Sequence, residues 1–242
     1  MMRLLIIPLL LWMGQAVSPS PSGDEICQYE VRYIVGDLNT KVAMATITTT
    51  PTMWEEKEVY KSEINIKVQP FFRLFLHAKY FVEAFVTRPG MQPLYYTTSS
   101  SKENAWCRYS EGEEGIVFWR HFKKKQEPTI LTFPNDGQTM ELVSMLYYVR
   151  TFDFKEGEPC ELKVLIGERA LPATLTMEGI DTEKYPGHRA MFIRFVMLER
   201  GIMENGSGNE AYLWIDADGS RIPLGLEVAL GKRGVMVCNI VE

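Results

Sequence analysis

The segment that decides the fold spans residues 138–151 and reads QTMELVSMLYYVRT. Four apolar or aromatic residues and one arginine recur near helical spacing in one stripe: Met140, Val143, Leu146, Tyr147 and Arg150. Such spacing predicts an amphipathic helix that packs through one face. The turn at residues 134–137 precedes the segment, and we expect Asp136 to cap the free amides of the first helical turn. The sequence therefore predicts one principal α-helix over 138–151.

On both sides of this segment, apolar and polar residues alternate. The alternation runs from Ile26 to about Val68 and returns from Cys160 to Val241, with many β-branched and aromatic side chains. A period of two in such residues predicts half-buried strands. Residues 71–85 satisfy neither the helical nor the strand period, and we interpret them as a strand, with a buried helix as the alternative.

About ten or more strands and a single long helix predict a mainly β fold. A long antiparallel sheet hides one face by curling into a barrel, by pairing with a second sheet or by wrapping around a helix. We predict a strongly curved antiparallel sheet or an open barrel that wraps the helix at 138–151 against its concave side.

The first residues of the chain have the pattern of an export signal. Arg3 precedes an apolar run from Leu4 to Met13, and Gly14 and Ala16 occupy the positions that a signal peptidase requires. The run is shorter than the roughly 20 residues of helix that span a bilayer. The sequence therefore predicts export to the periplasm, no membrane span after cleavage, and three regions: a signal peptide over 1–16, a flexible leader over 17–25 and a single β-rich domain over 26–242.

Charge and cysteine content narrow the class of protein. The formal net charge of −5 argues against nucleic acid as a partner, because phosphate binding requires a strongly cationic surface. Four cysteines are present: Cys27, Cys107, Cys160 and Cys238. An exported protein permits disulfides between them, but cysteines in apolar, strand-like segments also occur as buried free thiols, and both alternatives stay open.

The polar motifs favour structural roles. The histidines lack the spacing of metal ligands: His77, His121 and His188. Residues 99–102 match the Ser-x-x-Lys spacing without its companion motifs, and residues 216–219 fit a hairpin turn better than a calcium loop. The basic run 120–125 is typical of a solvated strand end, with contact to an anionic ligand or to lipid headgroups as the alternative. We expect no catalytic residue, no metal and no cofactor.

Aromatic side chains gather in residues 71–85 and on the predicted helix. They fit a hydrophobic core, and the alternative is an apolar pocket between sheet and helix in which Arg150 binds the polar head of an amphipathic ligand. The candidate ligand-binding residues are Phe71, Phe75, Phe81, Tyr147 and Arg150.

Two long segments carry a family resemblance, at residues 144–179 and 211–242. The first contains Leu146-Tyr147-Tyr148-Val149-Arg150 before two strands, and the second leads from a Trp-containing strand into a terminal hairpin. The chain resembles the exported Gram-negative bacterial family called domain of unknown function 3108. This resemblance implies a periplasmic β-rich protein without assigned catalytic residues. The terminal pattern is also similar, at the level of fold, to lipoprotein-localisation carriers, whose open barrels hold acyl chains, although fold does not fix function.

These observations favour a non-enzymatic envelope protein. We expect it to bind a lipid, another amphipathic small molecule or an envelope protein in the concavity of its sheet. One alternative is an enzyme that acts on envelope glycans, which needs two carboxylates across a cleft, with Glu83, Asp153 and Glu178 as candidates. The other alternative is a structural or assembly protein.

Overall fold

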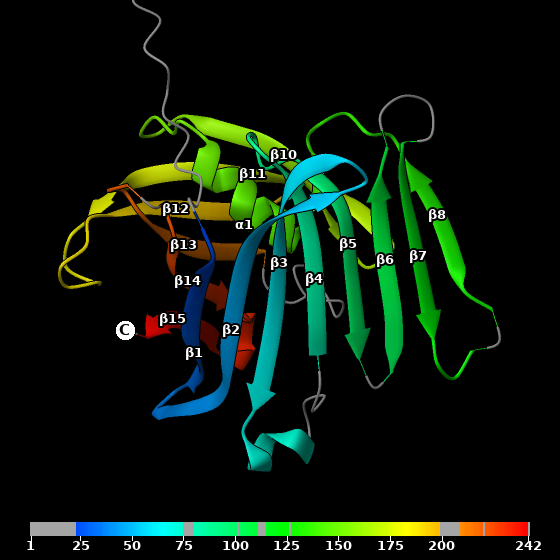
Figure 1. The fold of residues 1–242 in the computed structure, drawn as a ribbon. Coiled ribbons are helices and arrows are strands. Elements are labelled where there is room, and N and C mark those ends of the chain that lie inside the picture. The colour runs from blue at the N-terminus through cyan, green and yellow to red at the C-terminus, as the bar shows by residue number, and fades with distance from the viewer. Residues whose placement is uncertain are drawn as a thin grey trace, which may run out of the picture.

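The computed structural model describes residues 23–74, 80–100, 102–110, 115–125, 127–198, 209–219 and 221–241. In this part of the chain the strands form one 15-stranded sheet, and a single α-helix, α1 (Leu142–Thr151), packs against it (Figure 1). The predicted mainly β fold with one principal helix is therefore confirmed. The predicted signal peptide and most of the predicted leader lie outside the described residues, but Glu25, which was assigned to the leader, is the first residue of β1.

The sheet has two halves that follow the order of the chain. The first contains β1 (Glu25–Val35), β2 (Leu38–Trp54), β3 (Lys57–Val68), β4 (Tyr80–Thr87), β5 (Pro93–Ser100), β6 (Glu103–Tyr109), β7 (Ile116–Phe122) and β8 (Thr129–Phe133). The second contains β9 (Thr139–Glu141), β10 (Pro159–Ile166), β11 (Arg169–Asp181), β12 (Ala190–Met197), β13 (Glu210–Asp216), β14 (Pro223–Ala229) and β15 (Val235–Val241). Two short 3₁₀ helices, η1 (Pro70–Leu74) and η2 (Gly231–Arg233), lie in connections.

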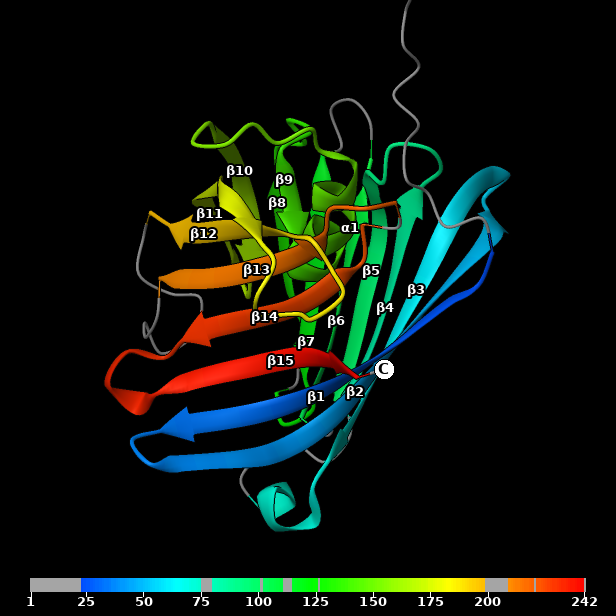
Figure 2. The ribbon, with the colours of Figure 1, turned by 90° about the vertical axis from the view of Figure 1, so that its left-hand side faces the viewer.

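The first and last strands join the two halves. β1 pairs with β2 on one side and with β15 on the other, in a register that runs from Gln28 opposite Val241 to Ile34 opposite Val235. Every pair is antiparallel except β9 with β10, and β8 and β9 are the two edges, so the sheet does not close into a barrel. Figure 2 shows the strands of the two halves crossing steeply with α1 between them.

Helix α1 packs on both halves through different side chains. Met145 and Val149 belong to the apolar cluster formed with strands β10–β13. Tyr147 points to the other half, where it packs with Tyr60 and Val86 of β3 and β4. We call the face of the sheet that α1 covers the inner face. The buried face of α1 consists of Ser144, Met145, Tyr147, Val149 and Arg150, so the predicted stripe is confirmed only for Tyr147 and Arg150.

The helix begins later than predicted, because the first residues of the predicted helix form a short strand instead. Residues 139–141 form β9, which pairs in parallel with Lys163–Leu165 of β10, and α1 begins at Leu142. The carboxylate of Glu141 caps the helix, because it accepts hydrogen bonds from the amides of Val143 and Ser144. Asp136 instead binds the turn before β9, where its Oδ1 accepts the amide of Gln138.

The segment at 71–85 contains two structures. Residues 70–74 form η1, and Pro70, which cannot donate a ladder hydrogen bond, follows the end of β3 at Val68. A strand begins only at Tyr80, with β4. The strand interpretation thus holds for the second part of the segment, and residues 75–79 lie outside the described residues.

All four cysteines are free thiols, so the disulfide alternative is not what the structure shows. Cys27 and Cys107 are buried, and burial raises the pKa of both thiols. Among the described residues no helix has the length and apolar character needed to cross a bilayer.

Candidate functional site

Two adjoining cavities lie beside α1 on the inner face of the sheet. The larger one has a volume of about 90 Å³, and every residue that lines it is apolar. Its lining comes from α1 and strands β11–β14: Leu142, Met145, Leu146, Leu175, Phe195, Ala211, Leu213, Leu226 and Val228. We call it the apolar cavity. Leu142, at its rim, is 40% exposed, so the cavity reaches the surface at the first turn of α1.

The smaller cavity has a volume of about 20 Å³, which is room for one water molecule. It is lined by both apolar and polar side chains: Glu25, Cys27, Tyr29, Ile47, Ile64, Val143, Leu146, Tyr147, Arg150 and Pro223. We call it the Arg150 cavity. Leu146 lines both cavities, so the apolar space and the mixed one adjoin at this helical side chain.

A buried ion pair forms the polar wall of the Arg150 cavity. Both Nη atoms of Arg150 donate to the two carboxylate oxygens of Glu25 at 2.8 Å, and Arg150 is only 1% exposed. Glu25 is the first residue of β1, whereas Arg150 is in the last turn of α1. The bidentate pair therefore fixes the end of the helix to the strand that joins the two halves.

Tyr147 forms a second polar link between α1 and the sheet. Its hydroxyl lies 2.6 Å from Oγ1 of Thr49 on β2 and 2.7 Å from Oγ of Ser62 on β3. All three side chains are buried, and burial raises the pKa of Tyr147. Because both hydrogen-bond partners of the hydroxyl belong to the sheet, Tyr147 holds the helix at a fixed position above β2 and β3.

Glu141 is a buried carboxyl group outside both cavities. Its oxygens accept hydrogen bonds from the amides of Val143 and Ser144 and from the hydroxyl of Ser144. Its own amide donates to the hydroxyl of Tyr109 on β6. Burial raises the pKa of Glu141 to about 7, although these hydrogen bonds oppose the shift. The group therefore caps the helix in an environment that disfavours its charge.

We expect this carboxyl group to make stability fall as pH rises. The folded protein binds the proton more tightly than the unfolded chain, so the stabilising contribution is complete below about pH 4.5 and is lost as pH rises through about 7. Urea unfolding at pH 5 and pH 7 should show a loss about 2 kcal/mol larger in the wild type than in Glu141→Gln. Equal losses in the two proteins would show that Glu141 ionises freely in the folded state.

The predicted ligand-binding residues do not form one group. Tyr147 and Arg150 line the same cavity. Phe71 is 67% exposed on η1, and Phe81, on the face of β4 that points away from α1, is 37% exposed. Neither phenylalanine lines either cavity, and Phe75 lies outside the described residues. A role for these residues in ligand binding remains a prediction.

The leucines that line the apolar cavity were missed by the sequence analysis. Leu146 belongs to the predicted helical stripe but Leu142 does not, and the alternation Ala211, Leu213 on β13 and Leu226, Val228 on β14 places four more side chains on the inner face. The alternation was the available signal, but it does not tell which of the many apolar inner positions remain uncovered by the helix.

The carboxylates considered for glycan hydrolysis lie apart from the cavities. Glu83 on β4 forms an ion pair with Lys61, and Glu178 on β11 forms one with Arg194. Asp153 is exposed after the end of α1. None of the three lines either cavity, so the geometry gives no support to a pair of catalytic carboxylates there.

The other polar motifs have structural partners. Ser100 Oγ accepts hydrogen bonds from the amides of Lys102 and Glu103 in the turn between β5 and β6, so Ser100 has a structural role there. The carboxylate of Asp216 accepts the amide of Asp218 within the turn after β13. His188 lies 3.8 Å from Asp216, and in the described part of the chain no cluster of His, Cys, Asp and Glu is suited to hold a metal ion.

Comparison with known proteins gives a family and a distant structural likeness. The model of a family described as "Protein of unknown function (DUF3108)" matches residues 28–237, from β1 into β15. The solved crystal structure of a LolA superfamily protein from Nitrosomonas europaea is 8% identical, with 92% of this chain and 86% of that chain covered at a TM-score of 0.25, which is too low to carry an argument. No curated protein matches the chain. Because the family model covers most of the sequence, the chain belongs to the DUF3108 family of proteins of unknown function.

Proposed function

We propose that this protein binds an apolar or amphipathic small molecule, without catalysis, in the two cavities beside α1. The observation that carries the proposal is the apolar cavity itself: a space of about 90 Å³ with no polar side chain in its lining and an opening at Leu142. Such a space is poorly hydrated, so apolar groups gain free energy when they leave water to enter it.

The polar neighbour of this cavity favours an amphipathic ligand. Arg150 and Tyr147 line the Arg150 cavity, which adjoins the apolar cavity at Leu146. Because Leu146 lines both spaces, we expect its rotation to join them, so that an apolar tail lies among Leu213, Leu226 and Phe195 while a polar head approaches Arg150. The described volume accommodates part of an acyl chain, and the joined cavities accommodate more.

The proposal includes a location and a domain boundary. The apolar run at residues 4–13 supports export to the periplasm. The pairing of β1 with β15 supports a single domain over 26–242, because the first and last strands of the chain meet in the middle of one sheet.

Leu142→Glu tests the proposal with a fluorescent apolar probe, N-phenyl-1-naphthylamine. A carboxylate at the rim must be desolvated or displaced when the probe enters, so we expect the dissociation constant to rise by about tenfold. The matched control is Ile180→Glu, because Ile180 has nearly the same exposure, 41%, on β11 but does not line the cavity. Equal weakening in both variants, or no probe binding by the wild type, would contradict the proposal.

A further inference from the structure

Exposed lysines gather at one end of the β1–β8 half. The connections β3–β4, β5–β6 and β7–β8 all lie at this end, because consecutive strands are antiparallel (Figure 1). The turn β5–β6 contains Lys102, and the turn β7–β8 contains Lys123, Lys124 and Lys125, all of them exposed. The amide of Lys123 donates to the carbonyl of Lys102, so the two turns are in direct contact. We call these four lysines the basic end.

Few acidic groups offset this charge. Glu103 is bound by Arg120, whose Nη2 lies 2.8 Å from its carboxylate, so this glutamate is already paired. Glu127 is the one acidic residue in the described part of the β7–β8 connection. Within the described residues, none of the four lysines forms an ion pair with a carboxylate. The basic end is therefore a local cationic patch on a chain with a net charge of −5.

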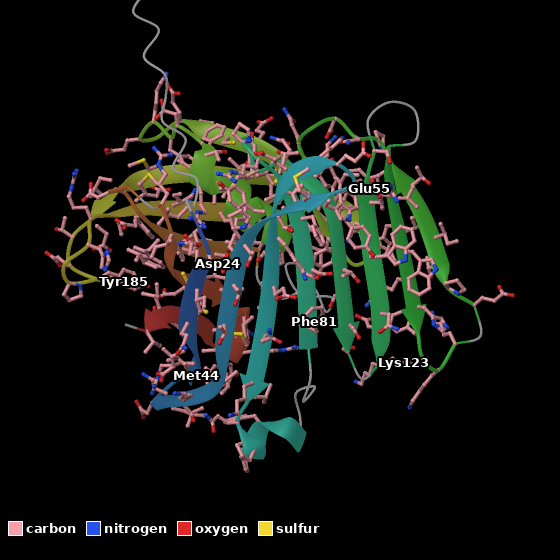
Figure 3. The ribbon with its side chains drawn as sticks, in the orientation of Figure 1. Asp24, Met44, Glu55, Phe81, Lys123 and Tyr185 are labelled. Atoms are coloured by element: carbon pink, nitrogen blue, oxygen red, sulfur yellow. The ribbon has the colours of Figure 1, made fainter. Side chains whose placement is uncertain are left out.

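Exposed apolar side chains lie beside the basic end. Phe71 lies on η1, in the β3–β4 connection at the same end of the sheet, and contacts the ring of Phe72 edge-on while it stays 67% exposed. Phe81 lies opposite Ser99 on β5, next to Ser100, whose carbonyl accepts Nζ of Lys123. Figure 3 shows Phe81 and Lys123 toward the same end of β4–β7. Cationic and apolar groups thus occupy one end of the molecule together.

We propose that this end is a docking surface for an anionic lipid bilayer. Lysines near an anionic membrane are attracted by its surface potential, and an exposed aromatic side chain inserts between headgroups. A soluble polyanion fits the lysines but leaves Phe71 in water, whereas a bilayer satisfies both kinds of group. Arg120 also belongs to the basic run at residues 120–125, but it is not part of this docking surface, because it is bound to Glu103.

Co-sedimentation with lipid vesicles tests this docking surface. We compare vesicles of phosphatidylcholine alone with vesicles that also contain phosphatidylglycerol, and use the ratio of the two partition coefficients, which cancels headgroup-independent binding by the apolar residues 4–13. The wild type should prefer the anionic vesicles. The triple variant Lys123→Ala, Lys124→Ala, Lys125→Ala should lower this ratio at least tenfold, since each nearby lysine contributes roughly fivefold.

Three further variants complete the test. Lys57→Ala, Lys155→Ala, Lys232→Ala removes the same charge from exposed sites elsewhere and should leave the ratio within about twofold. Phe71→Ser should lower binding to anionic vesicles several-fold, and if it has no effect while the lysines matter, the surface binds charge and not a bilayer. Leu142→Glu should leave vesicle binding unchanged, which separates this proposal from ligand binding beside α1. Equal ratios for the two triple variants would overturn the docking surface.

Discussion

Glu25→Ala should lower the free energy of unfolding by about 3 kcal/mol. The substitution leaves the guanidinium group of Arg150 buried without the carboxylate that neutralises it, and breaking a buried pair from one side costs several kcal/mol because the remaining charge stays out of water. The partial exposure of Glu25 places the expected loss at the lower end of that range. Urea unfolding followed by tryptophan fluorescence measures it.

Glu30→Ala is the matched control on the same strand. Glu30 also forms ion pairs, with Arg32 and Lys41, but all three side chains are partly exposed to water. We expect its removal to cost less than about 1 kcal/mol. A second variant, Glu25→Ala with Arg150→Met, removes both charges and should recover part of the loss. If Glu25→Ala and Glu30→Ala cost the same, the pair at Arg150 does not fix α1 to β1.

The helix was predictable from local spacing, but the side chains that it buries were predicted only in part: Tyr147 and Arg150 are buried as expected, whereas Met145 and Val149 were not in the predicted stripe. The first residues of the helix were not predictable, because whether residues 138–141 continue the helix or pair with β10 depends on a strand that lies more than twenty residues away. Glutamate is likewise not among the residues that helices prefer as an N-cap. The position of Glu141 before α1 is explained by its burial, where its amide binds the hydroxyl of Tyr109. Local preference was overridden here by tertiary pairing.

The polar partners at the candidate site depend on how the strands pair, and the spacing of residues in the sequence does not show this pairing. Tyr147 and Arg150 were singled out, but their partners Thr49, Ser62 and Glu25 come from three other strands. Sequence separations of 85 to 125 residues hide such contacts.

Phe81 and Phe85 show a different limit of sequence analysis. Their high hydrophobicity favours the inner face, yet the smaller residues Val82 and Ala84 take that face of β4. On the opposite face Phe85 stacks on Trp54 at a ring distance of 5.6 Å, and Tyr95 continues the aromatic row. Aromatic side chains can thus cover one another on an outer face, so hydrophobicity alone does not assign the face of a strand.

Gly234→Ala should lower the free energy of unfolding by about 4 kcal/mol. Gly234 has φ 100° and ψ −153°, a conformation almost restricted to glycine. A Cβ there would lie 2.1 Å from the backbone oxygen of Ile34 on β1, which cannot move without disturbing the pairing of β1 with β15. Backbone strain and overpacking each cost about 1–3 kcal/mol, and here they add.

Gly231→Ala, in the same turn, separates the two causes. Gly231 also has a positive φ, 62°, but a Cβ at this position meets no atom within 4 Å. We expect a loss of about 1 kcal/mol from backbone conformation alone. Urea midpoints of the two variants therefore measure how closely the last hairpin must approach β1.

A displaced β15 should also affect the cavities beside α1. Because β1 also carries Glu25, such a displacement should loosen the attachment of α1 and reduce probe binding in Gly234→Ala, while Gly231→Ala should retain probe binding. Equal midpoints in the two variants would mean that the junction between the first and last strands tolerates a wider separation than the structure shows.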